Sequence, residues 1–415
     1  MTEFRFLHAA DIHLDSPMRG LEADPDAPAK LLREASRSAF CNLIDLAIEE
    51  QVAFMLIAGD LYDGDWEDWR TGLFFTEQVA KLAEAGIPLV MVAGNHDAAS
   101  LITRRLRLPN GITRLPHDQC GQVLLDEYGV AIHGQSFATR AVTEDLSWNY
   151  PQAVPGLFNI GLLHTSLTGR FGHDNYAPTT VEALVAKGYD YWALGHVHAR
   201  EVVHENPWIV FSGNLQGRQI RESGTKGASL VIVRDGHVAS IEHRPLDVLR
   251  WCPVRVSVAG EPNLDGVMAR IGRALSEATG AAAGRPIAAR VTLTGATPLH
   301  GQLLGQSEHV RQGVIAESRQ QQGEMVWIES VAVDTQSATD LDALRGRPDI
   351  VGRLAKALDE LIDEIGIDLL DEYPERLRHR MPGIELPPDH PLREGGPDLL
   401  KRARELVLSE FTQQA

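Results

Sequence analysis

The chain has 415 residues, 44% of them hydrophobic and 23% charged, a composition typical of a globular protein long enough for two or three domains. Its formal net charge of −18 argues against strong independent binding to duplex DNA, and its three widely spaced cysteines argue against a disulfide framework or a cysteine-based zinc site. The sequence shows neither a signal peptide nor an apolar run that could span a bilayer, so we expect a cytoplasmic protein with no membrane segment.

Strand and helix patterns alternate at the start of the chain. Apolar runs at 4–10, 53–58 and 87–93 predict buried strands. Between them, apolar residues at helical spacing predict helices from about residue 30 to 50 and from about 69 to 85, and Gly86 suits the position just after a helix end. This βαβαβ order predicts a sheet covered by helices, with ligands bound on the loops at the strand ends.

The next part of the chain is richer in strands. Strands are predicted at 122–125, 130–134, 158–164, 191–195, 209–212 and 229–234. We therefore expect residues 1–247 to form one catalytic domain of α/β class, a two-sheet β-sandwich flanked by helices, with its polar motifs at one edge.

The pattern changes after residue 247. Strands at 253–258, 288–293 and 325–331 and a helix near 264–279 predict a small α+β domain over residues 248–337. Residues 338–415 are charged and mainly helical, and they form the third expected region. The apolar spacing within 354–362 and 399–408 fits either docking to a partner or packing against this chain.

Polar residues that can bind metals follow the predicted strands of the first domain. They are Asp11, His13, Asp60, Asn95, His164, His196 and His198, with His96 and Asp97 beside them. Carboxylates bridge neighbouring cations and neutral imidazoles fill the remaining positions, so this mixture predicts a site for two divalent ions. One ion is assigned to Asp11, His13, Asp60 and His198, and the other to Asp60, Asn95, His164 and His196. The alternative is that His164 is an ordinary buried histidine and that the others are turn and cap residues at strand ends, namely Asp11, His13, Asp60, Asn95, His96, His196 and His198.

The ordered motifs D-x-H, G-D, G-N-H-D, a single His and G-H-x-H resemble those of the calcineurin-like metallophosphoesterases. The sequences AADIHLD, AGDLYD and ALGHVH, at 9–15, 58–63 and 193–198, are similar to the DNA-repair exonuclease branch of that superfamily, which includes SbcD and YhaO-like nuclease subunits. The resemblance covers residues 4 to about 240. It implies the metallophosphoesterase fold and the ligand set given above, with manganese as the expected metal.

The resemblance also implies a mechanism. A metal-bound hydroxide would attack the phosphodiester, and His96 would stabilise the transition state or protonate the leaving oxygen. Asp97 would orient and charge the His96 ring. Some members of the branch carry a histidine after the G-D-L-F motif, but this chain has Asp63 at the corresponding position, so the role of that histidine is not carried over.

A glycine-rich segment at 213–218 follows a predicted strand. Asn214 and Arg218 within it are candidates for substrate binding, because the backbone amides of such a segment can contact a phosphate. The segment could equally be a tight turn with no ligand, and the sequence leaves both interpretations open.

The resemblance implies a two-metal DNA exonuclease or phosphodiesterase that acts in DNA repair or DNA-end processing. It further implies that residues 248–337 cap the DNA and that the helical tail binds a coiled-coil ATPase subunit, SbcC-like or YhaN-like; a homodimer is also compatible with it. One alternative is a metallophosphatase or phosphodiesterase for small molecules or phosphoproteins, which the acidity favours. The other is a non-catalytic DNA-end-binding scaffold subunit, which the intact set of metal-binding residues disfavours.

Overall fold

The computed structural model describes residues 3–18, 29–63, 69–98, 108–167, 176–338, 341–362, 403–404 and 407–408. The chain divides into two compact units, residues 1–252 with 285–288 and residues 253–284 with 289–415. Among the helices of the described ranges, none combines the length and the apolar character that crossing a membrane requires.

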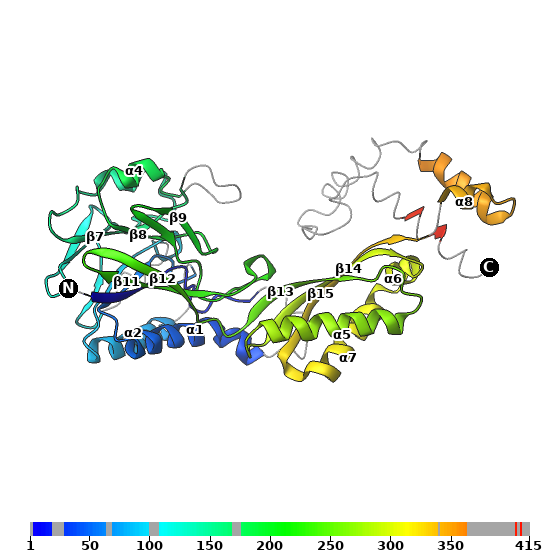
Figure 1. Cartoon of the computed structure of the whole chain (residues 1–415), viewed down its shortest axis with the longest axis horizontal. Helices are drawn as coiled ribbons and strands as arrows, with labels where there is room; N and C mark the ends of the chain where they lie inside the picture. The colour runs from blue at the N-terminus through cyan, green and yellow to red at the C-terminus, as the bar shows by residue number, and fades with distance from the viewer. Residues whose placement is uncertain are drawn as a thin grey trace. The chain divides into compact units, whose positions relative to one another are not determined.

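Two six-stranded sheets form the first unit (Figure 1). Its strands are β1 (Glu3–Ala9), β2 (Phe54–Ala58), β3 (Leu89–Val92), β4 (Ile112–Arg114), β5 (Gly121–Leu125), β6 (Val130–Gly134), β7 (Phe158–His164), β8 (Tyr191–Gly195), β9 (Glu201–Glu205), β10 (Trp208–Phe211), β11 (Gly227–Arg234) and β12 (His237–Pro245). The strand orders are β12-β11-β1-β2-β3-β4 and β5-β6-β7-β8-β10-β9. Strands β1 to β4 run parallel in the first sheet, and β6, β7, β8 and β10 run parallel in the second. The predicted two-sheet sandwich is confirmed.

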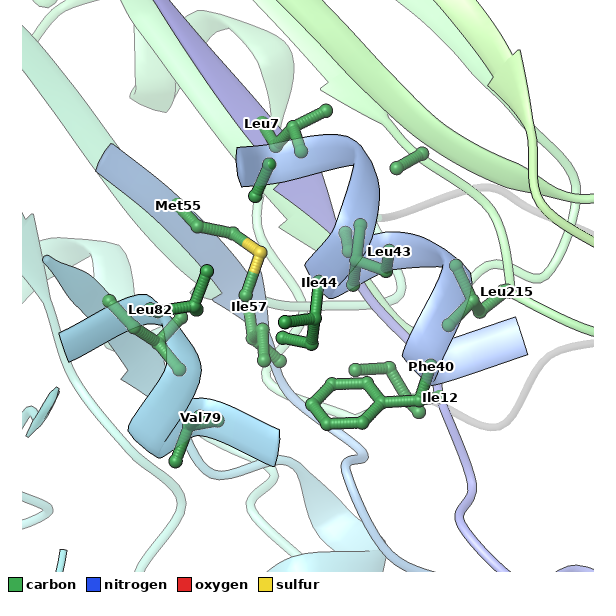
Figure 2. Close-up of a cluster of buried hydrophobic side chains, with 14 of the residues drawn as sticks. Leu7, Ile12, Phe40, Leu43, Ile44, Met55, Ile57, Val79, Leu82 and Leu215 are labelled. Carbon is green, nitrogen blue, oxygen red and sulfur yellow. The ribbon is translucent and has the colours of Figure 1, made fainter. Parts of the chain in front are cut away.

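Helices cover the sheets of the first unit. They are α1 (Ala29–Glu49), α2 (Arg70–Glu84), α3 (Asn95–Ala98) and α4 (Val181–Val185), with 3-10 turns η2 (Leu146–Asn149) and η3 (Ile220–Glu222). Figure 2 shows Phe40 and Ile44 of α1 packed against Met55 and Ile57 of β2, all of them fully buried. Helix α2 joins the same apolar cluster, so α1 and α2 cover one face of the first sheet.

The central strands of the sandwich are buried on both faces. In β1, Leu7 faces the cluster of α1 and α2, whereas Phe6 faces the apolar layer between the two sheets. Trp192 of β8 lies on the other face of the second sheet and packs with Leu184 of α4. Burial on both faces explains why these strands appear in the sequence as continuous apolar runs rather than as alternating patterns.

The second unit contains a three-stranded sheet of order β13-β14-β15. Its elements are β13 (Arg250–Ser257), α5 (Leu264–Ala281), β14 (Ile287–Thr297), α6 (His300–Gly305), α7 (Ser307–Gln322), η4 (Gly323–Met325), β15 (Val326–Ser337) and α8 (Leu341–Gly346). The first residues of β13 and of β14 belong to the first unit. Residues 350–362 are also helical, whereas most of the predicted segment 399–408 lies outside the described residues.

The sequence patterns missed several elements. Strands β9 and β12 lie at sheet edges and carry exposed polar residues, so they lack a continuous apolar run. Helix α7 buries only Val310, Val314 and Ser318, and this narrow stripe gives a weak helical pattern. Elements with little buried apolar surface are therefore the ones that sequence periodicity did not find.

Candidate metal centre

The predicted metal-binding residues meet at one edge of the sandwich. Asp11 follows β1, Asp60 follows β2, and Asn95 begins α3 just after β3, all in the first sheet. His164 is the last residue of β7 and His196 follows β8, both in the second sheet. Because parallel strands end at the same edge of a sheet, the two sheets bring these loops together, as the sequence predicted.

The backbone at this edge is strained. Asp11, His13, Asp60 and His196 have positive φ angles of 49°, 47°, 51° and 98°. Side-chain-bearing residues rarely adopt this left-handed region, and such residues concentrate at functional sites. The strain favours a functional site over the alternative of ordinary turn residues.

Two positions in the motifs, Gly94 and Gly195, require glycine because another segment of the chain lies too close for a side chain. A Cβ atom on Gly94 would overlap the side chain of Asp60, and one on Gly195 would overlap the carbonyl oxygen of Ala58. The glycines therefore let the loops after β3 and β8 pass directly against the end of β2.

Asp60 lies at the middle of the cluster. Its Oδ2 atom is 3.9 Å from His13 Nε2 and 3.5 Å from His164 Nε2. Its Oδ1 atom accepts a hydrogen bond of 3.0 Å from the backbone N–H of His96. Oδ2 thus faces a ligand of each predicted metal ion, and the backbone hydrogen bond holds Oδ1 in place. This arrangement is expected of a carboxylate that is shared by two metal ions.

Three imidazole rings present the same nitrogen to the cluster. His13 Nε2 and His198 Nε2 are 3.3 Å apart, and His164 Nε2 lies 2.9 Å from Asn95 Oδ1. Each ring places its Nδ1 atom near an oxygen: Ala58 O at 2.9 Å for His164, Asp63 Oδ1 at 3.4 Å for His13 and Glu222 Oε1 at 2.8 Å for His198. The hydrogen-bond acceptors at Nδ1 of His164 and His198 hold the proton there and leave the Nε2 lone pair for a metal.

Burial keeps two of the ligand histidines, His13 and His164, neutral. Desolvation lowers the pKa of His13 to about 4 and that of His164 to about 3. Burial raises the pKa of Asp11 to about 7, against the opposing effect of the nearby His198. Asp11 also accepts two hydrogen bonds of 3.0 Å from the backbone N–H of His196. Neutral imidazoles and buried carboxylates that lack full solvation are the donors that a divalent cation stabilises.

The residues present fit a metal site. Three groups of side chains have ligand atoms within 4.8 Å of one another: Asp11, His13 and His198; His13, Asp60 and His96; and Asp11, Asp60 and His164. The first group belongs to the first predicted ion, and the third joins Asp11 to ligands of the second. His196 is placed beside His164, with ring centroids 5.2 Å apart. The structure therefore brings all seven predicted ligands into one cluster.

His96 also lies at this cluster, but its predicted partner is wrong. Its Nδ1 atom is 3.1 Å from Asp63 Oδ1, and this hydrogen bond raises the pKa of His96. Asp97 instead accepts backbone hydrogen bonds of 3.2, 2.9 and 3.0 Å from Leu61, Tyr62 and Gly94. His96 and Asp97 are consecutive in α3, and consecutive helical side chains point about 100° apart, so they cannot face one another.

The two candidate substrate contacts have different positions. Asn214 is buried at 1% exposure and donates 2.9 Å hydrogen bonds to Gln216 O and Glu222 Oε2. Arg218 is 18% exposed, and its guanidinium lies 3.4 Å from both Asp63 and Glu222. Arg218 thus lies beside the metal-binding cluster, whereas Asn214 holds the loop that carries Gln216 and Glu222.

Sequence reasoning missed the partners of the histidines. Asp63 was noted only as a departure from a family pattern, and Glu222 carried no recognised motif. Burial raises the pKa of both acids, but their polar contacts outweigh it and keep the pKa low. The contacts with His13 and His96 lower the pKa of Asp63. The hydrogen bond with His198 and the charge of Arg218 lower the pKa of Glu222. Both are ionised acceptors at the edge of the centre.

The chain resembles known protein families over most of its length. Residues 4–200 match the family model of the calcineurin-like phosphoesterases, and residues 251–336 match that of the middle domain of metallophosphoesterase YhaO. The uncharacterized metallophosphoesterase YhaO of Bacillus subtilis is 34% identical over 304 residues, 72% of this chain and 73% of that protein. The DNA double-strand break repair protein Mre11 of Sulfurisphaera tokodaii is 26% identical over 273 residues, 60% of this chain and 64% of that protein. A solved dimetal phosphatase from Danio rerio, aligned over 57% of this chain and 94% of its own, is 13% identical with a TM-score of 0.35, too low to interpret.

Proposed function

Since this chain belongs to the calcineurin-like metallophosphoesterases, and to their YhaO-like members, we propose that it is a two-metal DNA exonuclease acting in DNA repair or DNA-end processing. One observation carries the proposal: the Oδ2 atom of Asp60 faces both His13 and His164, and these two histidines belong to the ligand sets of different ions. The name of the relative Mre11, a DNA double-strand break repair protein, supports DNA as the substrate.

The side chains have distinct roles in this proposal. Asp11, His13, Asp60 and His198 would hold one ion, and Asp60, Asn95, His164 and His196 would hold the other. When bound, divalent ions of this kind, manganese in our proposal, supply Lewis-acid activation of water and neutralise the charge of the phosphate.

His96 is the proposed catalytic acid. Asp63 binds its Nδ1 atom and favours the charged ring, so Nε2 is the nitrogen left to donate a proton to the leaving oxygen. Arg218 lies close enough to this pair to share a substrate phosphate, since its guanidinium is 3.4 Å from Asp63.

Cleavage assays with Mn²⁺ test the proposal. End-labelled single- and double-stranded DNA are compared with an aryl phosphodiester and an aryl phosphomonoester, using the wild-type chain and a His96→Ala variant. His237→Ala is the matched control, because it removes an exposed histidine of β12 instead. We expect nucleotide release from DNA that His96→Ala abolishes and His237→Ala retains.

The net charge of −18 favours a second candidate, a phosphatase or phosphodiesterase for small molecules or phosphoproteins. The same assay separates the two. Hydrolysis of the aryl esters with no release from DNA, even at high enzyme concentration, would refute the exonuclease and establish the second candidate.

An ATPase partner completes the proposal. We propose that a coiled-coil ATPase, SbcC-like or YhaN-like, docks on the helical residues 350–362 and supplies DNA affinity. One side of this helix packs Val351 and Ala355 against Leu344 and Leu408, whereas Ile350 and Leu361 are 74% and 48% exposed. Reconstitution with the ATPase should raise DNA cleavage, and an Ile350→Glu variant should lose that increase while keeping its own activity on aryl esters. No change in DNA binding or cleavage on adding the ATPase would refute this part.

A further inference from the structure

We propose that Glu222 is a positioning residue that orients the His198 ring for metal binding. The inference deepens the proposed function, because it rests on the same metal centre. It assigns a purpose to the loop after β10, which the sequence left open between a phosphate contact and a tight turn.

The contact between Glu222 and His198 is specific. Glu222 Oε1 lies 2.8 Å from His198 Nδ1, and the Glu222 side chain is only 7% exposed. The opposite ring nitrogen, Nε2, faces His13 in the group that also contains Asp11. A carboxylate only accepts hydrogen bonds, so this contact places the ring proton on Nδ1 and the free lone pair on Nε2.

The carboxylate is itself held from the other side. Its Oε2 atom accepts hydrogen bonds of 2.9 Å from Asn214 Nδ2 and 2.7 Å from the backbone N–H of Arg218. The Arg218 guanidinium approaches Oε1 at 3.4 Å. Each oxygen therefore has its own donors, and the orientation of the carboxylate is fixed before a metal binds.

The surrounding loop is built closely around this residue. A Cβ atom on Gly217 would lie 2.6 Å from the backbone oxygen of Glu222, so only glycine fits there. Lys226 Nζ donates a 2.9 Å hydrogen bond to His198 O, which holds the backbone of the same histidine. Ring and backbone of His198 are thus both restrained by residues 214–226.

These contacts make Glu222→Gln an informative variant. The two donors at Oε2, Asn214 Nδ2 and the backbone N–H of Arg218, cannot accept a hydrogen bond, whereas His198 Nδ1 can, so the amide oxygen of glutamine takes the Oε2 place and its NH₂ group lies against His198 Nδ1. The ring must then accept at Nδ1 and carry its proton on Nε2, the nitrogen that a metal needs. The change keeps the size of the side chain and reverses the ring tautomer.

The test measures Mn²⁺ binding to the full chain by isothermal titration calorimetry, without substrate. We expect Glu222→Gln to weaken binding by about 10- to 100-fold, the range for residues that orient metal-bound histidines. Glu205→Gln makes the same chemical change at an exposed position of β9 and should leave binding unchanged.

A double-mutant cycle shows whether the effect passes through His198. In a His198→Ala background, Glu222→Gln should weaken Mn²⁺ binding no further. An additional loss in that background would show a general loop defect and refute the positioning role. If Glu222→Gln does not fold, Glu222→Asp, which keeps the acceptor and shortens its reach, should give a smaller loss that also disappears with His198→Ala.

The two proposals fail differently. A wild-type chain that binds no Mn²⁺ would refute the metal centre and the proposed function with it. Normal binding by the wild type together with unchanged binding by Glu222→Gln would refute only the role of Glu222.

Discussion

A buried histidine outside the metal centre predicts a pH-dependent loss of stability. His8 in β1 is fully buried, with Nδ1 3.0 Å from the Tyr191 hydroxyl and Nε2 3.2 Å from Leu194 O. A neutral ring satisfies both contacts, because Nε2–H donates to the carbonyl and Nδ1 accepts from the hydroxyl. Burial lowers its pKa from 6.5 to about 3.

The sign and size of the effect follow from these values. Between pH 6.5 and 3 the unfolded chain binds a proton at His8 that the folded chain excludes, so stability falls as the pH falls. Each pH unit below 6.5 costs about 1.4 kcal/mol, so the cost at pH 5 is about 2 kcal/mol. For a unit of this size that corresponds to roughly 4–8 °C in melting temperature.

The assay compares thermal unfolding of the wild type and His8→Gln at pH 7.5 and pH 5, with the exposed His237→Gln as control. His8→Gln should be less stable than the wild type at pH 7.5, and the difference between them should shrink by about 2 kcal/mol at pH 5. Losses from other titrating groups are common to both proteins and cancel in the difference. An equal difference at both pH values would refute a neutral buried His8.

Three further predictions concern the metal centre. Mn²⁺ at 100 times its Kd should stabilise the wild type by about 2.7 kcal/mol in thermal unfolding, and Asp60→Asn should lose this gain because it removes the oxygen facing both His13 and His164. Gly94→Ala should destabilise the chain by about 1–3 kcal/mol and weaken Mn²⁺ binding, because its Cβ overlaps Asp60; Gly280→Ala, where a Cβ meets open space and the φ angle is not positive either, is the control. Asp63→Asn should move the alkaline loss of hydrolysis to lower pH, because the Asp63 contact raises the pKa of His96 and the charged ring is lost once the pH exceeds that pKa. An unchanged pH profile would exclude His96 as the acid.

The residues of the metal centre that the sequence predicted are those that lie at the ends of buried strands. Asp11, Asp60 and His164 each sit where a buried apolar strand stops, and strand ends are visible in a sequence as a change from apolar to polar residues. Parallel strands then bring those ends to a common edge. The two-sheet sandwich was predictable for the same reason, because its central strands are buried on both faces.

The parts that it did not predict depend on contacts across the fold. Asp63 reaches His96 from a neighbouring loop, and Glu222 reaches His198 from 24 residues further along the chain. No local pattern indicates such pairs. The error on Asp97 has the same origin, because adjacency in sequence suggested a contact that the geometry of a helical turn forbids.

The acidic charge is compatible with the proposed DNA substrate when the position of the acids is considered. Asp11, Asp60, Asp97 and Glu222 are between 0% and 7% exposed, and burial raises the pKa of Asp11 and of Asp97 to about 7, so these acids carry less negative charge near neutral pH than the formal count assigns to them. Bound divalent cations would offset part of their negative charge.

The acids that remain on the surface still repel a phosphate backbone, and this repulsion weakens as salt screens it. DNA binding by a chain that relied on its own basic contacts would instead weaken with rising salt. The salt dependence of DNA cleavage, measured with and without the proposed ATPase, therefore separates a DNA affinity that belongs to this chain from one that a partner would supply.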